Sequence, residues 1–81
     1  MLKIYGNMQC PDCVQCRAEL DQTGVAYEYL DLAEDLRNLK AFLQIRDLNP
    51  AFAQIRGKDK IGIPCIVRED GTVTLDWKEF M

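Results

Sequence analysis

Two cysteines separated by two residues are the strongest chemical signal in this chain. Cys10 and Cys13 enclose a proline and an aspartate in a C-P-D-C motif at residues 10–13. Two thiols at this spacing, at the start of a helix, have the usual geometry of a reversible disulfide. The motif is not unique to redox chemistry, because zinc and iron–sulfur sites also use paired cysteines.

The surroundings of the motif limit how a thiol could be activated. The chain has no histidine, which excludes a histidine-ligated metal and a Cys–His nucleophile pair. Pro11 suits the first turn of a helix, where a missing N–H costs nothing. Cys10 is therefore expected at a helix N-terminus, whose free N–H groups and positive dipole end favour a thiolate. Asp12 opposes this effect, because a nearby carboxylate disfavours a second negative charge.

The other two cysteines, Cys16 and Cys65, leave an alternative open. Cys16 shares a helical face with Leu20, which predicts a buried core residue, but it also completes a C-x2-C-x2-C run typical of iron–sulfur ligands. Cys65 starts an apolar segment and is expected either as a buried strand residue or as a further redox thiol or ligand. The alternative to a redox dithiol is thus a metal- or iron–sulfur-binding protein that uses Cys10, Cys13, Cys16 and, as a further ligand, Cys65. The redox hypothesis itself requires no metal.

Length and composition define the class of protein. Eighty-one residues predict one domain, residues 1–81. The net charge of −3 argues against a nucleic-acid partner, and no apolar run is long enough for a membrane-spanning helix. The N-terminal residues lack the apolar stretch of a signal peptide. We therefore expect a cytoplasmic, monomeric protein with no nucleic-acid or membrane partner.

The elements that must position the cysteines follow from periodicity and turn residues. Alternating apolar residues predict strands, and a stripe of leucines predicts the second of two long helices. Asp31 is expected to cap that helix, with Glu34 as its capping-box partner, and Asp70-Gly71 predicts a hairpin. The expected elements are strands at 2–5, 25–30, 65–68 and 72–75, helices at 11–23, 32–48 and 77–80, and a short helical turn between 50 and 57. The predicted fold is α/β in the order β-α-β-α-β-β-α, with a four-stranded mixed sheet flanked by helices.

This layout resembles the glutaredoxins, within the thioredoxin-like fold superfamily. The resemblance rests on Ile4-Tyr5 followed by the motif at 10–13, and on the Gly-Ile-Pro segment at 62–64. It implies a small thiol–disulfide oxidoreductase that reduces disulfides or mixed disulfides, with Cys10 as nucleophile and Cys13 as resolving thiol. It further implies a cis Ile63–Pro64 bond beside the thiols, with the backbone of Ile63 offering N–H and C=O groups to the substrate.

The resemblance also suggests which residues bind substrate. Pro11, Ile63 and Pro64 would lie beside the thiols. Independently of the resemblance, a basic cluster precedes this segment, formed by Arg56, Lys58 and Lys60. Such a cluster is either a solvated loop or a site that captures a carboxylate of the substrate or partner. Asp76 stands where the family has an acidic residue that holds glutathione, but Val73-Thr74-Leu75 replaces the Gly-Gly that usually precedes it. We therefore expect glutathione to be a weakened co-substrate, and a disulfide-containing protein or a reductase protein to be the better partner. Trp77 is expected to cover the core rather than to bind substrate.

Overall fold

The protein folds in the predicted order of elements. A computed structural model describes residues 1–81. The elements are β1 (Leu2–Gly6), α1 (Pro11–Thr23), β2 (Tyr27–Asp31), α2 (Leu36–Leu48), the 3₁₀ helix η1 (Pro50–Phe52), β3 (Cys65–Val67), β4 (Val73–Thr74) and the 3₁₀ helix η2 (Trp77–Phe80). The α/β, four-stranded class predicted from the sequence is confirmed.

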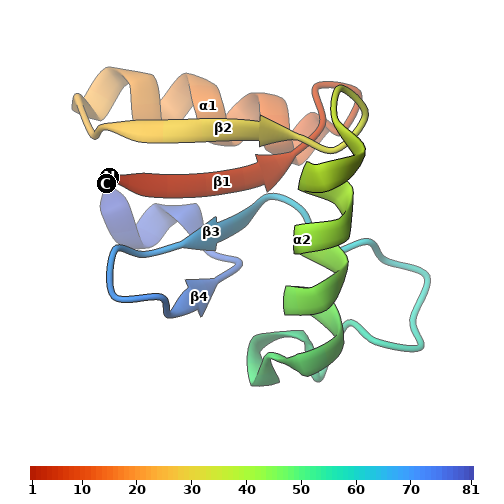
Figure 1. Ribbon diagram of the computed structural model, residues 1–81. Helices are drawn as coiled ribbons and strands as arrows, with labels where there is room; N and C mark the ends of the chain where they lie inside the picture. The colour runs from red at the N-terminus through yellow and green to blue at the C-terminus, as the bar shows by residue number, and fades with distance from the viewer.

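One mixed sheet organises the molecule, with its strands in the order β2-β1-β3-β4 (Figure 1). β1 runs parallel to β2, and β3 runs antiparallel to both β1 and β4. The parallel pair requires a crossover, which α1 supplies. Because β1 is central and ends at Gly6, the loop that follows it carries the cysteine motif to the edge of the sheet where α1 begins.

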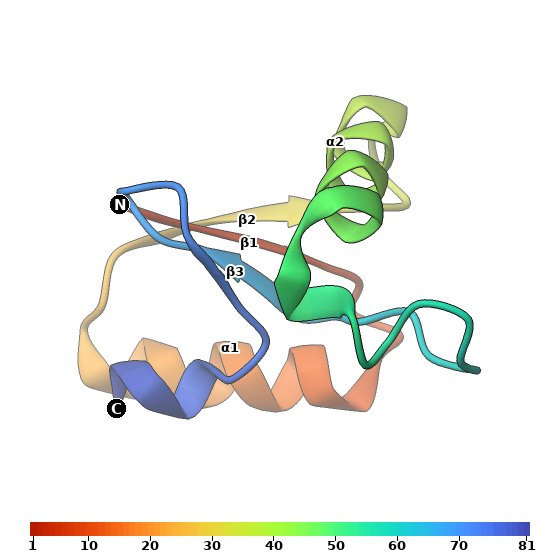
Figure 2. The same cartoon turned by 90° about the horizontal axis from the view of Figure 1, so that it is seen from below.

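The sheet separates two layers of helices, as the view from below shows (Figure 2). On one face lie α1 and η2, with a core of Ile4, Cys16, Leu20 and Ile66. On the other face lie α2 and η1, with a core of Tyr5, Phe42, Phe52 and Cys65. Adjacent strand residues alternate between the two cores, as the pleat of a strand requires. Cys16 and Cys65 are thus both fully buried, as expected, but on opposite faces of the sheet.

The predicted cap of the second long helix is wrong. Asp31 pairs with Gly6 in the parallel register and belongs to β2, so its position is too early for a cap. Its carboxylate instead accepts a hydrogen bond from the Ala33 amide at 2.7 Å, in the turn after the strand. Asp35 caps α2, since its Oδ1 accepts from the Arg37 amide at 2.8 Å. Asp35 lies four residues after Asp31 and has the same capping chemistry, and it caps the helix in place of Asp31.

Other elements also differ from the expected ones in their ends or in their type. β2 begins two residues late, at Tyr27, and β4 is only Val73–Thr74. Thr72 lies outside β4 because Asp70 holds its backbone amide and hydroxyl in the turn. The last helix is 3₁₀ rather than α, with the expected cap: Asp76 Oδ1 accepts from the Lys78 amide at 3.0 Å. The Ile63–Pro64 bond is cis, as the resemblance implied.

None of the helices has both the length and the apolar character needed to cross a membrane.

Gly62 provides a test of how tightly the segment before β3 is packed. Its φ is +92°, and a Cβ there would lie 2.5 Å from Cε1 of the buried Phe52. Gly57 has a similar φ of +76° but open space around it. Gly57→Ala should therefore cost only the left-handed strain, about 1 kcal/mol. Gly62→Ala should add overpacking, for a total of about 2–4 kcal/mol in urea unfolding. Equal losses in the free energy of unfolding for the two variants would contradict this packing.

The two buried cysteines outside the motif predict a loss of stability in alkali. Burial raises the pKa of Cys16 to about 11 and that of Cys65 to about 12, from an ordinary value of 9.0. The unfolded chain therefore releases these protons first, so the thiols' stabilisation is complete below pH 9 and is lost as the pH rises through 11–12. The Cys16→Ala/Cys65→Ala double variant should lose about 1–3 kcal/mol at pH 7.

The same variant should then show a shallower fall in the free energy of unfolding between about pH 8 and 10.5 than the wild-type protein shows. Cys13 is present in both proteins and cancels in the comparison. Burial is the main cause of the raised pKa of Tyr5 and Cys65 adds to it, so removing Cys65 reduces the shift at Tyr5 and makes the fall shallower still. Parallel pH curves for the two proteins would show that the buried thiols are not the cause.

Candidate active site around Cys10

Cys10 lies at the N-cap of α1, with an extended backbone at φ −89° and ψ 119°. Its carbonyl accepts the first hydrogen bonds of the helix, from Cys13 at 3.0 Å and Val14 at 3.1 Å. No side chain caps the helix and Pro11 has no N–H, so Asp12 is the residue of the first turn whose amide stays free beside the thiol. Cys10 is half-buried, whereas the other three cysteines are fully buried, and all four are free thiols. An incoming group can therefore reach only the thiol at the helix terminus.

Cys13 lies one turn further along, buried beneath Cys10. Burial is the main cause of a raised pKa at Cys13, and the contact with Cys10 adds to the shift. Two neighbours act in the opposite direction, the backbone of Asn7 and the hydroxyl of Tyr29. Cys13 is thus held as a protected thiol next to an accessible one, which is the asymmetry that a two-step dithiol reaction needs.

Asn7 organises the loop that joins β1 to α1. Its carbonyl accepts from the Cys10 amide at 3.0 Å, and its side-chain oxygen accepts from the Gln9 amide at 2.9 Å. Its side-chain Nδ2 donates to Asp31 at the end of β2, at 3.2 Å. The loop is therefore tied both to itself and to the sheet, which fixes the position of Cys10.

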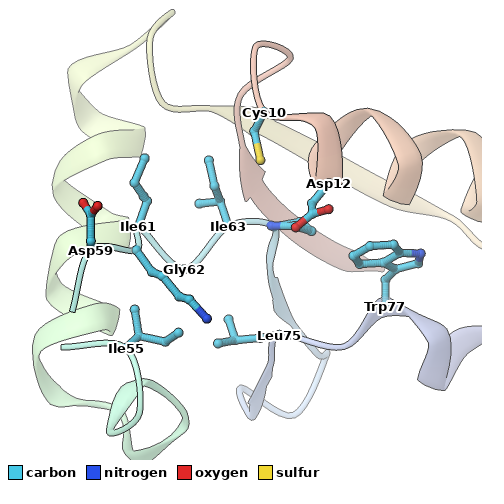
Figure 3. A pocket seen from close by; sticks show the side chains of 11 residues that line it. Cys10, Asp12, Ile55, Asp59, Ile61, Gly62, Ile63, Leu75 and Trp77 are labelled. Carbon is cyan, nitrogen blue, oxygen red and sulfur yellow. The ribbon is translucent and has the colours of Figure 1, made fainter.

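A shallow pocket of about 470 Å³ lies in front of Cys10. Figure 3 shows the Cys10 sulfur pointing into it, with Asp12 and Trp77 on one side and Ile63 on the other. Its lining is mostly apolar with three charged side chains: Cys10, Asp12, Ile55, Asp59, Lys60, Ile61, Gly62, Ile63, Pro64, Leu75 and Trp77. Two carboxylates and one ammonium group give these side chains a net negative charge.

A second, smaller pocket of about 360 Å³ lies on the other side of Cys10. It is formed by the loop after β1, the turn after β2 and the segment before Pro64: Asn7, Gln9, Cys10, Leu32, Ala33, Ile61 and Ile63. Cys10, Ile61 and Ile63 line both pockets. The thiol therefore opens onto a depression that continues on both sides of it, with two isoleucines opposite.

One arginine holds the segment opposite Cys10 in place, and a second fixes the chain just before that segment to the end of α2. Arg46, near the end of α2, donates to the carbonyls of Lys60 and Ile61, at 2.8 Å each. Arg56 donates to the carbonyls of Arg46 and Asn49, at 2.8 and 3.0 Å. The guanidinium of Arg56, which belongs to the basic stretch before Pro64, is therefore engaged with backbone and not turned to a ligand.

Only some of the predicted site residues line the pockets beside Cys10. Lys60, Ile63 and Pro64 line the first pocket with Cys10. Three other predicted substrate-binding residues, Pro11, Lys58 and Asp76, are exposed and line neither pocket beside Cys10. The carboxylate of Asp76 is engaged as the cap of η2.

Several residues of the site were missed by the sequence analysis. Asp59 and Ile61 flank Lys60 in a loop without periodicity, where only their nearness to the Gly-Ile-Pro segment is a signal. Leu75 was expected only as the last residue of a strand. Trp77 was expected to cover the core, and it does pack on the core beside α1, where its Nε1 donates to Glu19 at 3.0 Å. One edge of the indole nevertheless lines the pocket.

The structure places no group of three or more His, Cys, Asp or Glu side chains so that they could hold a metal ion. Cys16 and Cys65 lie in cores on opposite faces of the sheet, so they cannot share an ion with each other. The four-cysteine ligand set of the alternative hypothesis is therefore not assembled in this fold.

Comparison with known proteins agrees with this arrangement. The family model for glutaredoxin matches residues 2–67, which include the cysteine motif and the Gly-Ile-Pro segment. An uncharacterized protein of Haemophilus influenzae is 37% identical over 67 residues, covering 83% of this chain and 78% of that protein. No solved structure matched the chain. With the family model spanning most of its length and a thioredoxin-like α/β sheet beneath the motif, the chain belongs to the glutaredoxin family.

Proposed function

We propose that the protein is a dithiol–disulfide oxidoreductase in which Cys10 attacks and Cys13 resolves. The observation that carries the proposal is the contrast between the two thiols: Cys10 is accessible at a helix N-cap between two pockets, and Cys13 is buried beside it. Four unpaired cysteines, three of them in the interior, also fit a reducing, cytoplasmic setting.

The proposed cycle has two exchange steps. The Cys10 thiolate attacks one sulfur of a substrate disulfide, forms a mixed disulfide and releases the first thiolate, which takes up a proton. Cys13 then attacks the Cys10 sulfur, and its proton goes to the second departing thiolate. The substrate disulfide gains two electrons and two protons, and the enzyme ends with a Cys10–Cys13 disulfide that a donor must reduce.

The backbone of Ile63 supports the binding of an extended substrate. Neither its amide nor its carbonyl has a hydrogen-bond partner within the chain, although the residue lines both pockets beside Cys10. Free backbone groups of this kind pair with an added extended segment, as at a sheet edge. A cysteine-containing chain lying along Ile63 would bring its sulfur to Cys10.

The charges around the pocket favour a protein disulfide over glutathione. Glutathione carries two carboxylates and one ammonium group and is a net anion, whereas the pocket offers one cation, Lys60, against Asp12 and Asp59. Lys58 and Asp76, the other charged residues predicted to bind substrate, lie outside it. We therefore propose a disulfide-containing protein as substrate and a reductase protein as electron donor, with glutathione as a poor co-substrate.

Serine substitution of each motif cysteine tests the assignment of roles. Cys10→Ser should abolish disulfide reduction, whereas Cys13→Ser should accumulate a mixed disulfide that intact-mass measurement detects. The Cys16→Ala/Cys65→Ala variant, folded but without the other two thiols, should keep its turnover. Faster alkylation of Cys16 or Cys65 than of Cys10 at neutral pH would show that the nucleophile is wrongly assigned. Loss of activity in the folded double variant would instead favour a role for these thiols in catalysis or metal binding.

A glutathione-coupled assay tests the proposed preference. Turnover should be low with glutathione, and Lys60→Glu should lower kcat/KM for glutathione by about tenfold, because a charge-assisted contact is lost. Lys58→Glu makes the same change in charge two residues away, outside the pocket, and should have a smaller effect. Glutathione turnover as fast as with a reductase protein, and lost in Lys60→Glu, would show that glutathione is the donor. Equal losses in both variants would indicate a long-range charge effect.

A further inference from the structure

Tyr29 carries the one buried side-chain polar atom of the protein that has no hydrogen-bond partner. Its hydroxyl, on β2, is enclosed beneath α1, where the ring packs on the core of Ile4, Cys16, Leu20 and Ile66. A buried hydroxyl without a partner is costly, and folded proteins rarely contain one. Phenylalanine would fill the same space without that cost, so the hydroxyl calls for a reason other than stability.

The hydroxyl faces the sulfur of Cys13 across a space that only a glycine leaves open. A Cβ on Gly6, at the end of β1, would lie 2.8 Å from the Cys13 sulfur and 2.8 Å from the Tyr29 hydroxyl oxygen. Both atoms therefore border the same small volume between β1, β2 and α1. Each also affects the ionisation of the other: Tyr29 lowers the pKa of Cys13, and Cys13 raises that of Tyr29.

Other groups fix the ring and set the local field. Arg17 of α1 lies with its guanidinium carbon 4.2 Å from the centre of the Tyr29 ring, which holds the ring from the helix side. Besides Cys13 and Arg17, the charged or titratable groups that act on this site are Asp31 at the end of β2 and Cys10 at the helix cap. The backbone N–H of Asn7 is the other group that favours a negative charge on Cys13.

We propose that Tyr29 is a positioning residue whose hydroxyl donates a hydrogen bond to the Cys13 sulfur as that sulfur becomes a thiolate in the resolving step. The inference rests on the proposed dithiol cycle. A neutral thiol is a weak acceptor, so the hydroxyl stays unpaired in the resting dithiol; a thiolate is a strong acceptor, so the bond forms when it is needed. Cys13 gives its proton to the departing thiolate and its electron pair to the new bond with Cys10, while Tyr29 keeps its own proton throughout.

Tyr29→Phe, with Tyr27→Phe as the matched control, tests the proposal. Tyr27 lies on the same face of the same strand, but its hydroxyl pairs with Asp21 and Arg17, away from the thiols. Each protein is reduced, mixed rapidly with 4,4′-dithiodipyridine, and followed by the absorbance of the released thione between about pH 4 and 8. The first release reports attack by Cys10 and the second reports resolution by Cys13. Acid-quenched samples give the amount of mixed disulfide by intact mass.

We expect Tyr29→Phe to leave the first release unchanged and to slow the second by about 10- to 100-fold, the worth of a hydrogen bond to a charged group. The pH profile of the second release should move upward by about 1–2 units, and a mixed disulfide should accumulate that the wild-type protein does not show. The variant should melt at the same or a higher temperature, because an unpaired hydroxyl is removed. Tyr27→Phe should leave both releases unchanged.

Two outcomes would overturn the inference. One is a second release in Tyr29→Phe within twofold of the wild-type rate at every pH, with no accumulated mixed disulfide. The other is equal slowing of both releases together with a lowered melting temperature, which would mark Tyr29 as structural. Failure of the proposed function looks different. Either the wild-type protein would give no first release, or the Cys13→Ser variant would still give a second release, because a cysteine other than Cys13 would close a disulfide with Cys10.

Discussion

The close approach of α1 to the end of β1 at Gly6 is the contact on which the site depends. The buried Cys13 sulfur and the Tyr29 hydroxyl both reach toward the bare backbone of Gly6, where any side chain would collide with them. The approach lets the first turn of α1 sit directly against the sheet, so that Cys13 is buried while Cys10, at the cap, remains accessible. The difference in exposure between two thiols one turn apart therefore follows from a missing side chain on the neighbouring strand.

The opposite wall of the site is held by a different kind of interaction. The segment from Lys60 to Pro64 has no secondary structure of its own and is held by Arg46, whose guanidinium binds the carbonyls of Lys60 and Ile61. From the other side Gly62 packs against Phe52, which belongs to the core under α2. The free backbone groups of Ile63 are thus presented by a loop that is fixed from two elements. A substrate that pairs with Ile63 would not have to order the loop first, and it would avoid that entropic cost.

Sequence reasoning succeeded where the signal is local and failed where it depends on tertiary contacts. The cysteine motif, the proline at the start of α1 and the hairpin at Asp70-Gly71 each specify their own backbone conformation, and the structure has them where they were expected. The cap of α2 was misplaced because Asp31 and Asp35 have the same local chemistry. Only the pairing of Asp31 with Gly6 in the sheet decides between them.

The substrate side of the site shows the same limit more strongly. Lys58 and Lys60 are equivalent in sequence terms, yet only Lys60 lines the pocket. Arg56, from the same basic stretch, is turned to backbone carbonyls, and Arg46 gave no signal at all because its partners lie in a distant loop. Tyr29 was predicted simply as an alternating strand residue. That its hydroxyl stops beside Cys13 depends on the spacing of β2 and α1 and on the absence of a side chain at Gly6, which no pattern within β2 could reveal.

The arrangement of the two thiols also determines the direction of the proposed chemistry. A disulfide from outside can approach Cys10 along either pocket, but it cannot approach Cys13, which is enclosed by the sheet, the loop at Asn7 and the ring of Tyr29. Mixed disulfides would therefore form at Cys10 alone, and Cys13 would act only from within, on a sulfur that is already bonded. Because burial raises the pKa of Cys13, that thiol stays protonated and unreactive in the resting protein. Its activation must come from groups that favour the thiolate at the moment of attack, and the interior offers two of them, the Asn7 amide and the Tyr29 hydroxyl.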